Sequence, residues 1–211
     1  MTQRELIIEQ TTKMFVNHGV KAVRMDDIAH ELSVSKRTLY ELFGDKEELL
    51  YLCIKHFIEE GRTRRQKQIA EIDNDLEIML FSVRDMISVA PVAARMRRNI
   101  KRFYPSVFQR LEDDAQKASR DDLKRWLEKC VEQGYMVSTS NCDFVAKVLY
   151  ESAQGIMVSE NMESDNTMHV VSPISYSLVI FIRGLCTMKG IELIDRCFDK
   201  YFGNIPTPNT L

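Results

Sequence analysis

Residues 24–50 read RMDDIAHELSVSKRTLYELFGDKEELL and contain two short apolar stripes. Within each stripe the apolar residues lie one to four positions apart, which is the spacing of one buried helix face. The stripes consist of Ile28, Ala29 and Leu32, and of Leu39, Leu42 and Phe43. Between them, the hydroxyl of Ser35 can accept a hydrogen bond from a free amide of the next helix, and Val34 can fill the gap between the helices. The pattern predicts a helix-turn-helix.

The second of these helices has an exposed face whose side chains suit DNA. If Leu39 points inward, a period of 3.6 residues places Arg37 and Glu41 on the opposite side. Thr38 and Tyr40 flank them. A guanidinium, a hydroxyl and a phenol can hydrogen-bond base edges and phosphates in a major groove, which admits one helix. Two-helix corners are also common in all-α proteins that bind no DNA, so this pattern leaves both interpretations open.

The same stretch resembles the N-terminal domain of TetR-type transcriptional regulators, whose hallmark is the string V-S-x-x-T-L-Y-x-x-F-x-x-K-x-x-L. The chain matches it at Val34, Ser35, Thr38, Leu39, Tyr40, Phe43, Lys46 and Leu49. The resemblance covers roughly the first 50 residues, and beyond them only length and helical pattern agree with the family. It implies a DNA-binding regulator whose later helices dimerise and take an effector.

The resemblance also implies which residues contact DNA. Lys36, Thr38 and Tyr40 would lie on the DNA, and Lys46 would reach a phosphate from the start of the following helix. Arg24 and Arg37 fall on or beside the same face. The expected DNA-binding set is Arg24, Ser35, Lys36, Arg37, Thr38, Tyr40 and Lys46.

Four positions depart from the family pattern, so no relative's operator can be assumed for this chain. Arg24 stands where Ser or Thr is common, and Arg37 where Gly or a small residue is frequent. Leu42 replaces an aromatic residue or His. Ser33 stands where the turn usually has Gly, and it is strained if the turn requires a positive φ.

The composition is that of an ordinary soluble globular protein. The chain has 211 residues, of which 45% are hydrophobic and 28% charged, and a formal net charge of −2. One or two domains with a full core are therefore expected. The longest apolar run, at about residues 178–182, is far shorter than the roughly 18 residues that cross a bilayer. The first residues resemble no signal peptide, so we expect a cytoplasmic protein with no membrane partner.

Positive charge is unevenly placed along the chain. Residues 1–50 carry seven Lys and Arg but nine Asp and Glu, so their net charge does not attract DNA. DNA binding by this domain therefore depends on where its cations lie. Residues 95–110 hold six Lys and Arg and no acid. This segment is either a second nucleic-acid patch or a solvated helix between acidic neighbours, and the sequence leaves both alternatives open.

The sequence predicts no metal, no cofactor and no enzyme. The five cysteines are scattered without a C-x-x-C pair, and the four histidines form no i, i+4 pair, which favours buried free thiols. There is no glycine-rich phosphate loop, no G-x-S-x-G and no H-E-x-x-H.

Outside the helix-turn-helix, apolar residues keep a helical period along the chain. Helices are expected over residues 3–17, from 46 through 67, from 74 to a break at Pro91, and over 105–133, about 142–160 and about 173–190. Gly19 would end the first helix and Asp45 would cap the fourth. The predicted fold is all-α, with a three-helix DNA-binding domain at 1–48 and a helical effector-binding and dimerisation domain at 49–211.

The last helices predict a homodimer. Residues 174–188 are apolar on nearly all sides, so one face should pack on the chain's own core and another on a partner. The expected interface residues are Val148, Ser152, Gly155, Leu178, Phe181 and Leu185. A two-fold dimer would bind a palindromic operator whose half-sites lie about one helical turn apart.

Methionine and aromatic residues in the central helices suit an apolar ligand, although they serve equally well as plain core. Met makes up 11 of the 211 residues, and its flexible side chain fits irregular pockets. The candidate ligand-binding residues are Met79, Met86, Phe103, Phe108, Trp126 and Tyr150. An uncharged or amphipathic organic effector would release a repressor from DNA. The alternative is an architectural or protein-recruiting factor that binds DNA without any effector.

Overall fold

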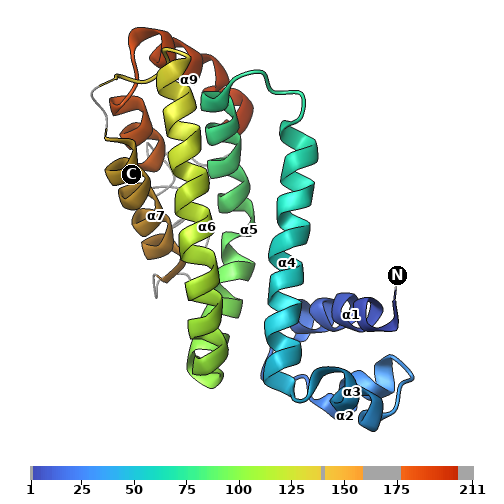
Figure 1. The fold of residues 1–211 in the computed structure, drawn as a ribbon. Coiled ribbons are helices and arrows are strands. Elements are labelled where there is room, and N and C mark those ends of the chain that lie inside the picture. Colours follow the sequence, from blue (N-terminus) through green and yellow to red (C-terminus); the bar gives the residue numbers. More distant parts are fainter. Residues whose placement is uncertain (1, 139–140, 159–176, 204–211) are drawn as a thin grey trace, which may run out of the picture. The chain divides into compact units, whose positions relative to one another are not determined.

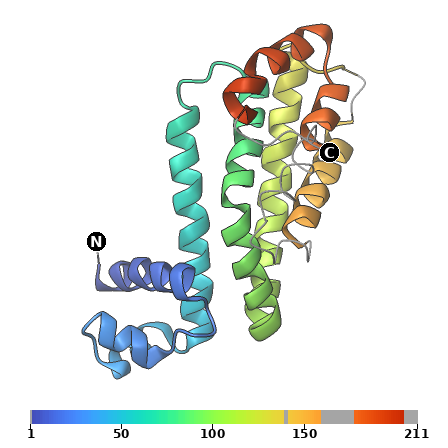
Figure 2. The same ribbon diagram turned by 180° about the vertical axis from the view of Figure 1, so that it is seen from behind.

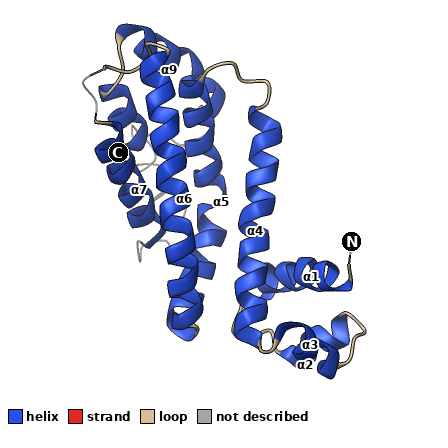
Figure 3. Ribbon diagram, viewed as in Figure 1, coloured by secondary structure: helices blue, strands red, loops and turns tan. Residues whose placement is uncertain are grey.

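The computed structural model describes residues 2–138, 141–158 and 177–203, most of which are helical (Figures 1 and 3). The helices are α1 (Gln3–His18), α2 (Met25–Glu31), α3 (Lys36–Phe43), α4 (Lys46–Ile69), α5 (Asp75–Phe103), α6 (Pro105–Glu132), α7 (Cys142–Val158) and α9 (Met188–Phe202). Residues 177–184 are helical as well. Within these described ranges, an isolated bridge between Met136 and Cys186 is the only β-type pairing. The predicted all-α fold class is confirmed.

The chain forms two compact units whose boundaries fall inside long helices. Unit 1 comprises residues 1–64 and 95–115, and unit 2 comprises residues 65–94 and 116–211. The helices α1, α2 and α3 lie wholly in unit 1, whereas α7 and α9 lie wholly in unit 2. These units are defined by compactness. The boundary expected at residue 48 separates DNA binding from effector binding, and it stays a prediction.

Unit 1 is built around apolar side chains that its first four helices bury together. They are Ile7 and Phe15 of α1, Ile28 of α2, Leu39 and Phe43 of α3, and Leu49, Leu50 and Cys53 of α4. Local signals set the ends of these helices as expected. Gly19, with a φ of 83°, ends α1, and a side-chain oxygen of Asp45 accepts the Glu48 amide at 2.8 Å at the start of α4. These two ends bound the part of the chain that contains the short helices α2 and α3.

Unit 2 has its own core, to which several helices contribute. It contains Leu76, Met79 and Leu80 of α5, Leu127 and Cys130 of α6, Val145 and Leu149 of α7, Ile182, and Leu193 and Ile194 of α9. The helices α6 and α7 lie side by side in both views (Figures 1 and 2), and Lys124 of α6 is 3.8 Å from Asp143 of α7. Asn141 caps α7 as expected, because its side chain accepts the Phe144 amide at 3.1 Å.

The predicted helix break at Pro91 is wrong. The helix α5 runs from Asp75 to Phe103 with Pro91 inside it. A proline leaves one i→i−4 hydrogen bond unmade, here at the carbonyl of Ile87, and costs about 3 kcal/mol in a helix interior. Ala90 and Ala94 are fully buried on either side of the proline. The buried face therefore continues past Pro91, and its packing outweighs the local cost.

The C-terminal helices are divided differently from the expectation. The segment expected as one helix over about 173–190 is helical over 177–184, its first residues lie outside the described part, and a separate helix α9 begins at Met188. Sequence reasoning missed α9. A signal was present, because the hydroxyl of Thr187 caps α9 by accepting the Gly190 amide at 3.3 Å. The buried stripe of α9 is Leu193, Ile194, Cys197, Tyr201 and Phe202.

The break before α9 is made by contacts with a distant part of the chain. The amide of Val137 donates to the carbonyl of Leu185 at 3.0 Å, and that of Thr187 donates to Tyr135 at 2.9 Å. A Cβ at Gly190 would lie 2.2 Å from the Tyr135 oxygen, so only glycine fits there. Pairing between segments so far apart in sequence leaves no periodic signal, and this explains why the break was not predicted.

Candidate nucleic-acid interface

A tight turn of residues 32–35 joins α2 to α3. The amide of Val34 donates to the carbonyl of Ala29 at 3.0 Å, and the amide of Ser33 donates to the carbonyl of His30 at 3.2 Å. Ser33 has a φ of 53°, a left-handed conformation that costs a non-glycine residue about 1–2 kcal/mol. The turn thus requires a positive φ where the family pattern usually has Gly, and packing of α2 on α3 holds Ser33 in this conformation.

Ser35 fixes the start of α3. Its side-chain oxygen accepts the backbone amide of Thr38 at 2.9 Å, and the two hydroxyl oxygens are 2.8 Å apart. The predicted N-cap is confirmed. Because the Thr38 hydroxyl already bonds Ser35, a DNA contact by Thr38 would have to share that hydroxyl. The cap orients the first turn of α3.

The two faces of α3 differ sharply in exposure. Leu39 and Phe43 are buried in unit 1, whereas the side chain of Arg37 is 86% exposed. Lys36 is about half exposed, and Tyr40 is 44% exposed. The exposed face presents a guanidinium, an ammonium and a phenol, and the opposite apolar face is anchored in the core. These three groups can donate hydrogen bonds to base edges in a major groove.

Exposed acids hold the cations of α3. The Lys36 ammonium lies 2.8 Å from Asp26 of α2, and this hydrogen bond raises the pKa of Lys36 above its usual value. The Arg37 Nε donates to Glu41 at 2.7 Å, one helical turn further on. Water and salt screen such pairs, so DNA can replace these partners at little cost.

Residues 7–51 match the family model described as "Bacterial regulatory proteins, tetR family". Residues 7–51 thus resemble the DNA-binding domain of TetR-type transcriptional regulators. Among curated relatives, it is 30% identical over 81 residues to the HTH-type transcriptional regulator HbdR of Aromatoleum sp.. That match covers 38% of this chain and 35% of HbdR, so it spans about a third of the relative.

Solved structures of transcriptional regulators, the first of them described as TetR-family, share the fold over most of the chain. One from Pectobacterium atrosepticum superposes with a TM-score of 0.70 at 22% identity, covering 87% of this chain and 94% of that one. A transcriptional regulator from Saccharomonospora viridis in complex with choline has a TM-score of 0.63 at 17% identity, covering 87% and 97%. At these identities the likenesses concern the fold alone, and they extend over most of the chain.

The other expected DNA contacts lie outside α3, at the starts of α2 and α4. The Arg24 side chain is exposed, and its backbone amide donates to Asp27 at 2.7 Å at the start of α2. Lys46 is half buried. Its Nζ donates to the carbonyl of Val20 at 2.8 Å and lies 5.3 Å from the ring centre of Tyr104. Lys46 thus fastens the start of α4 to the α1–α2 loop, so a phosphate contact would have to share its ammonium.

Sequence reasoning did not assign a role to Glu41. Its carboxylate accepts a hydrogen bond from the Nε of Arg37 at 2.7 Å, and this bond uses neither of the two terminal amino groups of the guanidinium. Two such groups match the paired acceptors of guanine. The available signal was the Arg–Glu pair at i and i+4 on an exposed helix face.

The six candidate ligand residues fall in different units. Met79, Met86 and Trp126 belong to or pack against the core of unit 2. Tyr150 is also in unit 2, and its hydroxyl accepts Gln154 at 2.7 Å. Phe103 and Phe108 lie in unit 1. Lys21 lies 4.4 Å from the centre of the Phe103 ring and Arg97 lies 4.9 Å from that of Phe108, so both rings already hold cations.

Five of the six expected dimer residues lie at least partly at the surface of unit 2. On α7, Val148 is half buried, whereas Ser152 and Gly155 are exposed. Phe144, which follows the same helix face, is strongly exposed. Phe181 is 38% exposed and Leu185 is half buried. Leu178, by contrast, is buried in the core of its own chain, so it cannot present its side chain to a partner. Ile180, two positions further on, is 67% exposed.

The five cysteines are free thiols, and four of them are buried as expected. Burial raises the pKa of Cys53 to about 12 and that of Cys130 to about 12. These two thiols are therefore protonated and unreactive near neutral pH. Within the described ranges, no group of three or more His, Cys, Asp or Glu side chains could hold a metal ion, and no helix is long and apolar enough to cross a membrane.

Proposed function

We propose that this chain is a dimeric TetR-type repressor, with no enzymatic activity, that binds a palindromic operator in the cytoplasm and leaves it when a small organic effector binds. The observation that carries the proposal is the contrast between the two faces of α3. Buried Leu39 and Phe43 anchor the helix, while Arg37 and Lys36 stand in solvent on partners that DNA can replace. This is the arrangement that base reading in a major groove requires.

Within this proposal each DNA-facing residue has its own role. Arg37, held by Glu41, reads a guanine through its two terminal amino groups. Lys36 and Tyr40 contact backbone or base edges beside it. Arg24 and Lys46 contact phosphates, which position the protein without selecting sequence.

Dimerisation rests on the exposed surface of unit 2. Phe144, Val148, Ser152 and Gly155 lie four, four and three positions apart, so they follow one line along α7. Among the described residues, no atom outside its own helix lies within 4 Å of a Cβ built at Gly155. Small residues at Ser152 and Gly155 would let a second copy of α7 approach closely, and Ile180 and Phe181 would extend the apolar contact. A second copy of this chain is the occupant that gives the operator its two-fold symmetry.

Release by an effector requires that movement in the helical core reach α4, which follows the DNA-reading helix. In unit 1, a row of polar contacts at intervals of about four residues joins α4 to the first turns of α6. The contacts are Ser106 with Glu47, Arg110 with Glu48 at 2.8 Å, and Asp114 with Tyr51 at 2.6 Å and with Lys55 at 3.1 Å. Hydrogen bonds from Tyr51 and Lys55 hold the pKa of Asp114 below its usual value, so it stays ionised. A shift of α6 would therefore move α4, with a coupling of about 5- to 150-fold in operator affinity.

The effector class follows from the residues of unit 2. Met79, Met86 and Trp126 supply flexible and aromatic surface in or beside its core, which suits an uncharged or amphipathic organic molecule. The regulator from Saccharomonospora viridis holds choline, which supports a small-molecule site in this fold. An architectural factor without an effector remains the alternative function.

The test combines operator selection with effector release. The wild-type chain, selected against random duplex oligonucleotides, should return an inverted repeat with half-sites about one helical turn apart, and light scattering at micromolar concentration should give the mass of a dimer. Organic compounds that raise the melting temperature should then lower operator affinity. A monomeric mass or asymmetric sites would contradict the dimeric repressor. Ligands that bind tightly without changing operator affinity would favour the architectural factor.

A further inference from the structure

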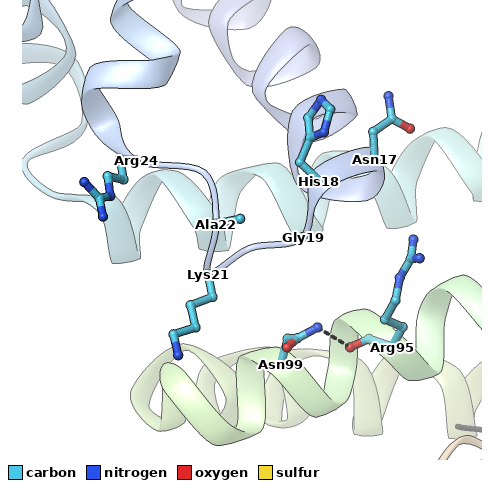
Figure 4. A pocket seen from close by; sticks show the side chains of 8 residues that line it. All are labelled: Asn17, His18, Gly19, Lys21, Ala22, Arg24, Arg95 and Asn99. Atoms are coloured by element: carbon cyan, nitrogen blue, oxygen red, sulfur yellow. Dashed lines mark hydrogen bonds between the residues drawn. The ribbon is translucent and has the colours of Figure 1, made fainter.

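Unit 1 contains an open cavity whose walls carry positive charge (Figure 4). Its volume is about 480 Å³, which lies within the range of small-molecule sites. The lining residues are Asn17, His18, Gly19, Lys21, Ala22, Arg24, Arg95 and Asn99. They come from the end of α1, the α1–α2 loop and the basic part of α5. The lining therefore combines three permanent cations, a histidine and two carboxamides with no carboxylate.

None of the three cations is neutralised by an acid within the described ranges. The Arg95 guanidinium donates to the backbone carbonyl of Val16 at 2.9 Å, and the Lys21 ammonium lies over the ring of Phe103. The Arg24 side chain is exposed and makes no ion pair with an acid of the described residues. Elsewhere in unit 1 cations do find acids, as Lys36, Arg97 and Arg110 show. The cations around the cavity thus retain most of their capacity to bind an anion.

The cations stand at separate places around the cavity. In Figure 4, Lys21 extends from the loop toward the helix that carries Asn99, whereas Arg95 extends from that helix toward Asn17 and His18. Arg24 projects from the opposite end of the loop segment. One monovalent anion could meet only part of this set, so the arrangement suits a ligand with two or more anionic groups. Guanidinium groups bind phosphate oxygens in pairs.

We propose that this cavity is a binding site for a small polyanion that carries two or more phosphate groups, such as a diphosphate. Lys21 and Arg24 bind one phosphate from the loop side, and Arg95 binds the other from α5. The Asn17 carboxamide donates a further hydrogen bond, and so does the second N–H of the Asn99 carboxamide, whose first N–H donates to the Arg95 carbonyl at 3.0 Å. A concave site can surround a compact free anion. The DNA backbone needs no such cavity, because a flat or convex basic surface contacts it equally well. This site is separate from the organic-effector site proposed in unit 2, and it accounts for part of the basic segment at 95–102.

The test measures binding of inorganic pyrophosphate to the full chain by calorimetry, at constant ionic strength. Wild type should bind with a dissociation constant below about 1 mM. Lys21→Gln and Asn99→Asp should each weaken binding by about tenfold or more, since one removes a cation and the other adds an anion. Arg64→Gln, which removes one exposed cation of unit 1 outside the cavity, is the matched control and should bind as wild type. Melting curves of all variants show whether each is folded.

Three results would overturn the proposal. The first is that wild type does not bind pyrophosphate. The second is that Arg64→Gln weakens pyrophosphate binding as much as the cavity variants do. The third is that both cavity variants are folded and bind pyrophosphate as wild type does. If Lys21→Gln and Asn99→Asp lower operator affinity while wild type binds no pyrophosphate, the cavity serves the DNA backbone and the proposal is wrong.

Discussion

The helix α3 and residues 95–102 of α5 are both basic segments of unit 1, yet they place their arginines in opposite surroundings. Arg37 of α3 is 86% exposed and pairs with an exposed acid of its own helix. Arg97 of α5 is 22% exposed, bonds both carboxylate oxygens of Glu112 and lies over the ring of Phe108. The first arginine can exchange its partner for DNA, whereas the second holds α5 to α6. Charge density alone therefore does not identify the surface that reads DNA.

The largest effect on stability is expected when Arg97 is replaced. Arg97→Ala should lower the free energy of unfolding by about 2–3 kcal/mol, because it leaves a half-buried Glu112 without its paired hydrogen bonds. Urea unfolding measures this loss. The preferred operator sequence should not change. A stable Arg97→Ala protein with altered DNA affinity would show instead that residues 95–110 form a second nucleic-acid patch.

Lys46 combines both kinds of role, so its replacement should have a mixed effect. Lys46→Ala removes a hydrogen bond to Val20 and a cation over the Tyr104 ring, and we expect a loss of about 1–2 kcal/mol in unfolding free energy. If Lys46 also reaches a phosphate, all DNA sequences should bind more weakly, and the slope of log affinity against log salt should fall by about one. An unchanged salt slope at reduced stability would assign Lys46 to the fold alone.

The smallest effect concerns Glu41, which we expect to position Arg37. Glu41→Gln keeps the size and one acceptor oxygen but loses the charge, so discrimination at the base pair read by Arg37 should fall by less than about 1 kcal/mol. Competition binding with single-base operator variants measures this. Thermal stability should stay at the wild-type value. If discrimination fell at other base pairs instead, Glu41 would read DNA directly.

Local signals predicted unit 1 well, because its short helices are ended by adjacent residues. Ser35, Gly19 and Asp45 cap or terminate helices as expected, and the strain at Ser33 follows from the turn itself. These features depend on side chains within three or four positions, which sequence patterns describe directly. The exposed face of α3 could be predicted for the same reason.

The missed features depend on contacts between distant segments. The continuation of α5 through Pro91 depends on the buried Ala90 and Ala94, and the start of α9 depends on backbone pairing of Tyr135 with Thr187. Leu178 was assigned to a dimer face because residues 174–188 are apolar on nearly all sides, and such a pattern cannot tell which face the core takes. The basic cavity joins residues about 75 positions apart, so no local motif marks it.

The most direct measurement is to compare wild type and Arg37→Ala in selections from the same pool of random duplex oligonucleotides. Reading by α3 predicts that Arg37→Ala loses preference at one or two base pairs of each half-site, by about 1–3 kcal/mol for each lost bidentate contact. The melting temperature should not change, since this side chain stands in solvent. Arg97→Ala should show the reverse, with lower stability and an unchanged selected sequence. An Arg37→Ala protein that selects the wild-type sequence with undiminished preference would contradict the assignment of α3 as the helix that reads DNA.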